Sequence, residues 1–543
     1  MGVIALIYKI WRTCYTPVIP GEPPIVRHII PFFGHFWGLM RHAHEYVNKL
    51  CQNTSHPIFT IPVLHGKAYV VSSPSFAQAV FRNKALSFAP FVVEFVHRME
   101  DLSAPAKRAY AEGLHTQVMQ LFAARMNGSA RKKMAAVALQ ELARLLPHHR
   151  LSEGDIAGSP SNSPVQDLWL WLRTIMTVST TSSLLGTTNN PWIKDHSLVE
   201  SYWKFEAGDP TGRTSLIDVT YRNSKKSHDT MVDALEAYFA AECDVSSVDS
   251  SDSFVAPLTV DTAAIQRKYG FSAREIAATY VTIVHGALVN MVPTLFWCVA
   301  YIFSRPSLLA QLREELISAL VSENGQRPEE DGKPRIVVMD ADKIESCCPL
   351  MLSAFRETQR LVAIGTLHRR VVEDTTVSHN GGEGQELSYL LKKGTSILLP
   401  VASTHRNPLI WGPTANEFEA TRFLGSQSQT REAAMTPDNQ EKLEDEESTF
   451  ARLRKTAYFP FGGGRELCPG RHFATTEVLG TMAVLVLGYD IRTIDGGPLK
   501  QPRFAPSRMT AATARPHPEA DLKVQIGRRD GWKEVVWKIK DFP

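Results

Sequence analysis

One cysteine in a glycine-rich loop, directly ahead of an apolar helical stretch, constrains this chain more than any other feature. The loop has the sequence FGGGRELCPG over residues 461–470, and Arg471 begins an alanine- and leucine-rich stretch. Backbone N–H groups of such a loop, with the positive end of the following helix, are expected to stabilise a thiolate and lower the pKa of Cys468. The sequence therefore predicts that Cys468 is a metal ligand. The alternative is an inert, buried cysteine in a glycine-rich turn.

The composition is that of an ordinary globular protein. The chain has 543 residues, of which 44% are hydrophobic and 21% charged. A net charge of +3, with no basic run interleaved with aromatics, argues against a nucleic-acid partner. The seven cysteines are scattered without a Cys-x-x-Cys pair, which argues against a disulfide framework and favours a reducing compartment.

Residues 1–26 indicate an anchor-like segment followed by a proline hinge. Residues 3–8 are apolar, but Lys9 and Arg12 interrupt them well short of a membrane-spanning length. Four prolines over residues 17–24 form a stiff, non-helical connector. This pattern favours a segment that dips into a membrane surface, and a trimmed or misassigned start is the alternative.

Helical periodicity dominates the rest of the chain, so the expected fold is mainly α with a small β-rich portion. We expect one catalytic domain over 27–543, interrupted by a charged insertion at about 425–450. A β-hairpin is expected over 58–72 and short strands over 368–402. Helices are expected over 35–51, 74–83, 105–146, 165–186, 227–243, 271–303, 306–321 and 350–361. Pro293 should bend the long helix 271–303.

A second constellation precedes the cysteine loop. Glu357 and Arg360 are three residues apart and share one helical face, and Arg422 follows in the segment FEATRF over 418–423. This order of motifs, ending in the loop around Cys468, resembles the cytochrome P450 enzymes, the heme-thiolate monooxygenases. The resemblance implies a cytochrome P450 fold in which Glu357, Arg360 and Arg422 form a buried ion network.

The resemblance also implies the cofactor, which is heme b (iron protoporphyrin IX) with Cys468 as its axial thiolate ligand. Such a ligand donates electron density that favours O–O cleavage. The residues implied to contact the cofactor are Cys468, Phe461, Gly464, Arg465, Gly470 and Arg369. One departure concerns the heme propionates, because Glu466 occupies the position at which the family usually has Arg or His. Glu466 is expected to repel a propionate, and Arg369 is the favoured propionate partner.

The other departure concerns oxygen chemistry on the long helix. The family usually has Ala-Gly-x-acid-Thr there, and this chain has GALVN over residues 286–290. Gly286 and Ala287 would allow close approach of the macrocycle or O₂. Val289 cannot relay a proton, and Asn290 offers a neutral amide. Asn290 is expected to orient the oxygen species, or alternatively to bond a carbonyl freed by the bend. The neighbouring His285 is expected to be a pocket wall or a helix hydrogen-bonder.

The spacing of Asn290, Pro293, Phe296 and Trp297 looks like the branch with sterol 7/12-alpha-hydroxylases and prostacyclin synthase, in a fungal secondary-metabolism setting. The resemblance implies hydroxylation or oxidation of a hydrophobic terpenoid- or steroid-like molecule, or of another secondary metabolite. The reaction would use O₂ and electrons from an NADPH-dependent cytochrome P450 reductase. The enzyme would lie at the cytosolic face of the endoplasmic reticulum membrane. One alternative is an isomerase or rearrangement catalyst that needs no reductase, and another is a non-catalytic heme or lipid carrier. Apolar pocket walls are expected from 88–95, 284–288, 362–366 and 509–513, which suits a lipid-like substrate.

Overall fold

The structure is a computed structural model of the whole chain. It describes residues 19–30, 34–63, 66–146, 165–208, 219–246, 254–321, 336–381, 385–424, 451–507 and 511–540. The predicted anchor over residues 1–18 and the insertion at about 425–450 lie outside these ranges. The division into a hinge and one catalytic domain therefore stays a prediction.

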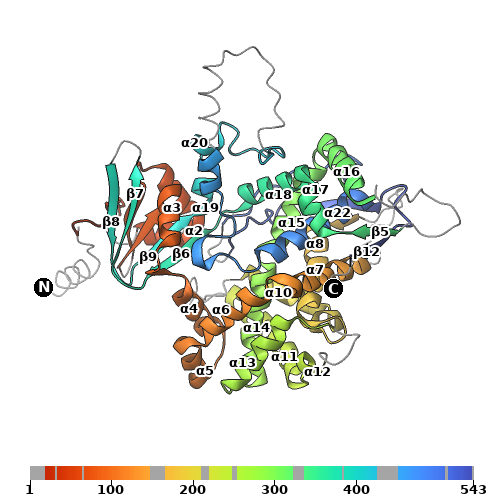
Figure 1. Cartoon of the computed structure of the whole chain (residues 1–543), viewed down its shortest axis with the longest axis horizontal. Helices are drawn as coiled ribbons and strands as arrows, with labels where there is room; N and C mark the ends of the chain where they lie inside the picture. The colour runs from red at the N-terminus through yellow and green to blue at the C-terminus, as the bar shows by residue number, and fades with distance from the viewer. Residues whose placement is uncertain are drawn as a thin grey trace, which may run out of the picture.

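A β-rich portion lies on one side of the molecule and a larger helical body on the other (Figure 1). The β-rich portion is built on a five-stranded sheet in the order β1-β2-β9-β6-β3. Only the β2–β9 pair in this sheet is parallel. The elements of this portion are α2 (Gly34–Gln52), β1 (Ile58–Val63), β2 (Gly66–Val71), α3 (Pro74–Arg82), β3 (Leu86–Ser87), β6 (Thr366–Val371), β7 (Thr375–Gly381), β8 (Gln385–Leu391) and β9 (Ser396–Pro400). The predicted hairpin over 58–72 and the predicted strands over 368–402 are confirmed.

The helical body supplies most of the core and confirms the mainly α fold. Its helices before the long helix are α4 (Ala89–Met99), α5 (Ala104–Ala109), the π-helical turn η1 (Tyr110–Leu114), α6 (His115–Arg125), α7 (Gly128–Leu145), α8 (Leu168–Leu185), α9 (Pro191–Lys194), α10 (Ser197–Ala207), α11 (Val219–Ala240), α12 (Cys243–Ser246) and α13 (Pro257–Lys268). Those after it are α16 (Pro306–Val321), α17 (Ala341–Cys347), α18 (Pro349–Val362), α19 (Val401–His405), α20 (Pro408–Trp411), the 3-10 turn η4 (Gly464–Glu466) and α22 (Arg471–Gly488).

Small strands border the helical body. They are β4 (Val165–Asp167), β5 (Ile336–Met339), β10 (Tyr489–Thr493), β11 (Lys523–Arg528) and β12 (Val536–Ile539). The order β10-β11-β4 makes one small sheet, and β12 pairs in parallel with β5. The first three residues of the helix expected over 165–186 therefore form a strand, because they pair with β11.

The long apolar helix is divided into α14 (Ala273–Leu288) and α15 (Met291–Phe303). The break lies at Val289 and Asn290, and Pro293 belongs to the first turn of α15, so the bend expected from Pro293 is confirmed. A proline ring clashes with the carbonyl four residues before it, which here is that of Val289. The whole stretch Ala273–Phe303 is apolar enough to cross a membrane, but 83% of its most apolar window is buried inside the protein. It is thus placed as a core helix, and every residue of α15 is buried.

Candidate functional site

Cys468 lies in the loop between η4 and α22, immediately ahead of an 18-residue helix. The Cys468 N–H donates to the carbonyl oxygen of Phe461 at 3.1 Å, which closes the loop on itself. Gly464 has φ +70°, and a Cβ there would lie 2.0 Å from the Phe81 carbonyl oxygen. The glycine is therefore required both by its backbone conformation and by the close approach of α3. The loop leaves Cys468 half-buried, with its sulfur near the start of α22.

The electrostatics of this thiol differ from the prediction. Burial raises the pKa of Cys468, and the Gly470 backbone, the Arg471 charge and the Arg471 backbone lower it by less. The expectation that the loop alone lowers the pKa is therefore wrong, because desolvation of the thiolate outweighs these groups. A bound metal cation is itself a large positive charge that deprotonates a coordinating thiol.

The three network residues come together in the interior. Arg360 donates to both carboxylate oxygens of Glu357, at 2.7 and 2.8 Å, and both side chains are fully buried. Arg422 donates from Nε to Glu357 Oε1 at 2.9 Å and also bonds the Trp411 and Thr414 carbonyls. Glu357 thus joins α18 to the segment that follows α20. Removing one member of such a buried set leaves an uncompensated charge.

His405 connects this network to the cysteine loop, a role that the sequence did not reveal. Its carbonyl oxygen accepts from Arg360 Nη1 at 2.6 Å, and its ring Nε2 accepts from the Phe459 N–H at 3.1 Å. Phe459 in turn accepts the Gly462 N–H at 3.0 Å. Burial, with help from the Arg360 charge, lowers the pKa of His405 to about 3, so its ring is neutral and can accept this bond. The only sequence signal was its place beside Arg406-Asn407-Pro408.

Arg369 and Glu466 form an ion pair at the edge of the cysteine loop. Arg369 Nε lies 3.0 Å from Glu466 Oε2, and Arg369 Nη2 donates to the Gly463 carbonyl at 3.2 Å. Glu466 also accepts from Ser87 Oγ at 2.8 Å and from the Phe88 N–H at 2.7 Å. The expected repulsion from Glu466 is therefore offset by Arg369, because the two charges neutralise each other. Arg465, by contrast, is exposed.

The long helix presents one open face inside the otherwise buried body. Gly286 and Asn290 are exposed although their neighbours Leu288 and Val289 are buried. A Cβ at Gly286 would meet no atom within 4 Å among the described residues. Ala287 is half-buried beside it. The open face accordingly has room for a flat ligand or a small molecule next to Gly286.

Thr513 fixes the amide of Asn290 at the break in the helix. Its hydroxyl donates to Asn290 Oδ1 at 3.2 Å, which directs the amide N–H groups away from Thr513. The carbonyl of Asn290 accepts from the Thr294 hydroxyl at 2.8 Å and from the Thr294 N–H at 3.2 Å. Among the described residues, the Asn290 side chain is thus bonded to Thr513, and its role toward oxygen stays a prediction. Sequence reasoning missed Thr513 as its partner.

The expected pocket walls converge on this face. The N–H groups of Ile364 and Gly365 both donate to the Ala512 carbonyl at 2.9 Å, which joins segment 362–366 to segment 511–513. The rings of Phe95 on α4 and His285 on α14 stack with 6.5 Å between centroids. In the fourth expected wall, 509–513, residues 509 and 510 lie outside the described residues.

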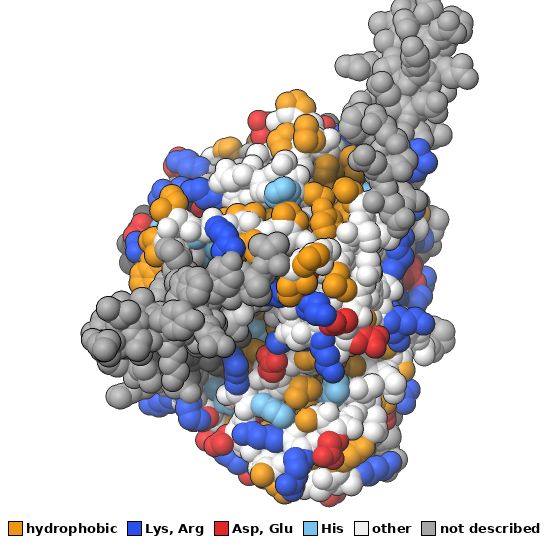
Figure 2. Space-filling model, turned by 90° about the vertical axis from the view of Figure 1, so that its left-hand side faces the viewer, with side chains coloured by type: hydrophobic (Ala, Val, Ile, Leu, Met, Phe, Trp, Pro, Cys, Tyr) orange, Lys and Arg blue, Asp and Glu red, His pale blue; other side chains and the backbone are white. Residues whose placement is uncertain are grey.

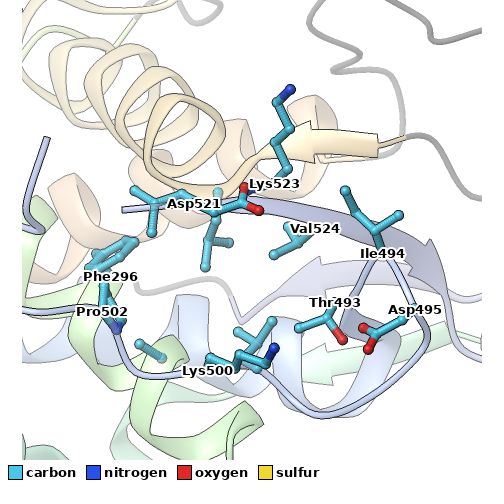
Figure 3. Close-up of a pocket in the computed structure, with 13 residues that line it drawn as sticks. Phe296, Thr493, Ile494, Asp495, Lys500, Pro502, Asp521, Lys523 and Val524 are labelled. Atoms are coloured by element: carbon cyan, nitrogen blue, oxygen red, sulfur yellow. The ribbon is translucent and has the colours of Figure 1, made fainter. Parts of the chain in front are cut away.

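A separate cavity of about 400 Å³ lies beside the small sheet (Figure 3). Its wall includes Phe296 of α15 and charged side chains from the start of β11 and from the loops next to β10 and β11, namely Lys523, Asp495, Lys500 and Asp521. None of its lining residues belongs to the cysteine loop or to α14. It is distinct from the face beside Gly286.

A mainly helical body with a half-buried loop cysteine and a braced Glu-x-x-Arg pair defines a heme-thiolate class of protein. The comparisons agree, and the chain belongs to the cytochrome P450 family, whose pattern matches residues 23–519. It is 30% identical to a cytochrome P450 monooxygenase of Gibberella zeae, over 99% of this chain and 95% of that one. It is 24% identical to cytochrome P450 monooxygenase nodJ of Hypoxylon pulicicidum, over 98% and 94%. It is also similar to 25-hydroxycholesterol 7-alpha-hydroxylase of Rattus norvegicus, with 27% identity over 50% of this chain and 58% of that one.

These findings confirm the resemblance, the fold, the monooxygenase class of oxidoreductase and the cofactor. The family carries heme b with an axial cysteine. The residues present fit this group, since a half-buried loop thiol, a buried arginine beside it and an open glycine face are all found.

Proposed function

We propose that this monooxygenase hydroxylates or oxidises a hydrophobic terpenoid- or steroid-like molecule, or another secondary metabolite, with O₂ and electrons from an NADPH-dependent cytochrome P450 reductase. The observation that carries this proposal is the half-buried Cys468 thiol at the head of α22 in a chain of this family. The named activities of similar proteins, which include a sterol 7-alpha-hydroxylase and a 12-alpha-hydroxylase, support a hydrophobic substrate.

Each site residue has a proposed role. Cys468 would hold the iron of heme b, which supplies the oxygen activation when bound. Phe461, Gly464 and Gly470 shape the loop around the cofactor, while Arg369 and the nearby Arg465 are its candidate propionate partners. Glu357, Arg360 and Arg422 keep the loop in place through His405.

On the opposite side, the open face of α14 receives substrate and O₂. Gly286 and Ala287 leave room there, and the Asn290 amide, held by Thr513, would donate hydrogen bonds to an oxygen atom that enters this face. Val289 is buried and apolar, so it moves no proton. The apolar walls exclude water from this face.

The direct test is the reduced CO spectrum of the purified protein and of its Cys468→Ser variant. The wild type should give the thiolate-type band and should form product in an NADPH- and reductase-dependent way. The serine variant should lose both, because a hydroxyl is a poor ligand for this iron. An unchanged spectrum and turnover in Cys468→Ser would contradict the proposal.

A rearrangement catalyst that needs no reductase is the second candidate. The observation that favours it is the pair of Val289 and Asn290, which places a valine and an amide where the family usually has an acid and a threonine. The two candidates differ in electron demand. O₂ consumption coupled to NADPH oxidation and product excludes the rearrangement, and product formed from a peroxide without NADPH supports it.

We also propose that the protein sits on the cytosolic face of the endoplasmic reticulum membrane. Close to the anchor-like N-terminal residues, Ile29 and Trp37 are 97% and 62% exposed. Figure 2 shows hydrophobic side chains gathered in the upper part of the face that carries the β-rich portion, with lysines and arginines around them. An apolar patch with a basic surround suits an anionic lipid surface. Co-sedimentation with anionic vesicles, lost after Trp37→Ser with Ile29→Ser, tests this placement.

A further inference from the structure

Glu100, directly after α4, carries a buried carboxylate that joins three helices. The residue is 3% exposed, and its Oε2 lies 2.9 Å from His228 Nε2 of α11. Its Oε1 accepts from the Thr282 hydroxyl of α14 at 2.9 Å. A carboxylate is buried at low cost only when it is paired and hydrogen-bonded. This one side chain therefore fixes the end of α4 to α11 and α14.

Both ring nitrogens of His228 face carboxylates. Nε2 lies 2.9 Å from Glu100, and Nδ1 lies 3.4 Å from Oδ1 of Asp229, the next residue of α11. A neutral imidazole has one N–H, whereas the protonated ring donates from both nitrogens. Burial by itself lowers the pKa of His228, but the bonds and charges of Glu100 and Asp229 outweigh it and raise the pKa above 6.5. The geometry therefore favours a charged His228 bound to Glu100.

The neighbouring helices bring no other group that titrates in this range. α10 contributes the Phe205 ring, 5.5 Å from that of His228, and α14 contributes a hydroxyl. Burial raises the pKa of Tyr110 in η1 to about 12, so its phenol stays neutral. Lys225 of α11 lies 3.2 Å from Asp229 in an exposed position. Among the described residues, His228 is therefore the group of this contact whose charge changes above pH 6.5.

α4 spans one side of the site, from the cysteine loop to α14. At its start, Glu466 of the cysteine loop accepts from the Phe88 N–H at 2.7 Å. Toward its end, the Phe95 ring stacks on that of His285, next to the open face of α14. Thr282 and His285 share one face of α14, since they are three residues apart. α4 lies where the β-rich portion meets the helical body (Figure 1), and it closes one side of the open face.

α4 itself is weakly packed. Its sequence APFVVEFVHRM is largely apolar, yet among its residues 89–99 Val96 alone is buried. An element with few buried apolar contacts opens at a low cost in free energy. Glu94 of α4 pairs with Arg370 at 3.0 Å but is 42% exposed, so that pair adds little. The buried contact of Glu100 therefore has a large share in keeping the end of α4 closed.

We propose that Glu100 and His228 form a proton-controlled latch, which holds α4 closed over the open face while His228 is protonated and lets it open when the proton leaves to solvent. This inference rests on the proposed function, because it assigns a control of ligand entry to the same site. Hydrogen bonds between ionised groups are stronger than those with a neutral partner, and the ring also loses one of its two N–H donors. Loss of the proton therefore weakens the contact, and bulky ligands enter and leave faster at high pH.

The test compares two triazoles that bind heme iron through the same nitrogen but differ in bulk. Purified full-length ferric holoprotein is mixed with N-methyltriazole or with biphenylmethyl triazole at pH 6 and pH 8.5, and stopped-flow heme absorbance gives the association rates. Neither ligand changes its protonation in this range. The rate of the bulky ligand relative to that of the small one should rise about fivefold between these pH values, as a weaker hydrogen bond implies. A constant ratio of the two rates overturns the proposal.

His228→Gln is the informative variant, because an amide keeps a hydrogen-bond donor but cannot take up a proton. Its ratio of rates should stay constant with pH, close to the wild-type ratio at pH 8.5. A ratio that still rises would overturn the proposal, since the titrating group would then lie elsewhere. If this variant does not retain heme, Glu100→Gln should show the same constant ratio, and the wild-type ratio decides in either case.

His97→Gln is the matched control. His97 belongs to α4 and is half-buried, but its Nε2 lies 3.0 Å from the Lys107 carbonyl oxygen and not beside a carboxylate. The control should keep the wild-type rise, and loss of the rise in this variant alone would overturn the assignment to His228. The reduced CO spectrum of the wild type separates the two proposals. Absence of the thiolate band defeats the proposed function, whereas a normal band leaves the pH dependence of ligand entry to decide this inference alone.

Discussion

At the scale of single residues, Glu477 shows how a buried carboxyl group makes stability depend on pH. It lies on α22, is 1% exposed, and accepts from the Thr180 hydroxyl at 2.7 Å. Burial raises the pKa of Glu477 from 4.5 to about 8, against the opposing bonds from Thr180 and Ser179. The unfolded chain ionises near pH 4.5 and the folded protein only near pH 8, so stability should decline as the pH rises through this window.

Glu477→Gln should remove this decline. The variant should be within about 1 kcal/mol of the wild type near pH 5 and more stable than it by about 4 kcal/mol near pH 8, because only the wild type must bind a proton on folding there. Denaturant unfolding at pH 5, 6.5 and 8 measures the difference. Glu519→Gln, at an exposed position, is the control and should show no such trend. A difference that stays constant with pH would contradict the assignment.

Asn290 is the residue whose chemistry departs most from the family pattern. If Asn290 has the proposed role, Asn290→Ala should lower the product formed per NADPH by about tenfold or more, because it removes the hydrogen-bond donor. Heme content and the reduced CO band should not change. Thr513→Val keeps the Asn290 amide but removes the hydroxyl that holds it, so product per NADPH should fall less than in Asn290→Ala. If the wild type and Asn290→Ala form the same amount of product per NADPH, Asn290 takes no part in the reaction.

At the scale of elements, the cysteine loop depends on α18 and on the segment after α20. Glu357→Gln should destabilise the protein by about 3–5 kcal/mol, because it leaves the buried Arg360 and Arg422 without their shared carboxylate. Glu419→Gln is a matched control, since Glu419 also pairs with Arg422, at 3.0 Å, but is 42% exposed. The control should cost less than about 1 kcal/mol. Thermal unfolding with heme absorbance as the probe distinguishes the two.

The elements also show what the sequence could predict. Glu357 and Arg360 are local on one helix, and the loop around Cys468 is a continuous motif, so their order in the chain and the family resemblance were enough to predict them. The bend of the long helix was predicted from Pro293, because a proline disturbs the carbonyl four residues earlier in the helix. The partners of these motifs were not predictable. His405 and Thr513 are common residue types, and only the fold brings them to Phe459 and Asn290.

The pKa of Cys468 illustrates the same limit in electrostatics. The donors around the sulfur can be read from a glycine-rich loop ahead of a helix, but the depth of burial cannot. Here burial decides the direction of the shift.

At the scale of the whole molecule, the β-rich portion and the helical body meet at the cysteine loop. Glu466 of this loop binds Arg369 of β6, Ser87 at the end of β3, and Phe88, which immediately precedes α4. One carboxylate therefore ties the loop to the sheet and to the start of α4. Arg369 is only 5% exposed, so it has little access to water if this partner is lost.

Glu466→Gln should therefore loosen the junction between the two portions. We expect a stability loss of about 1–2 kcal/mol, less than for a fully buried pair because the Glu466 side chain is 27% exposed. Transfer of heme to apomyoglobin should become several-fold faster, since the loop that holds the cofactor is less firmly attached. Glu94→Gln is the matched control, because Glu94 pairs with the adjacent Arg370 at 3.0 Å in a more exposed setting. If both variants release heme at the same rate, the junction does not depend on Glu466, and the sheet and the helical body must be held together by their apolar contacts.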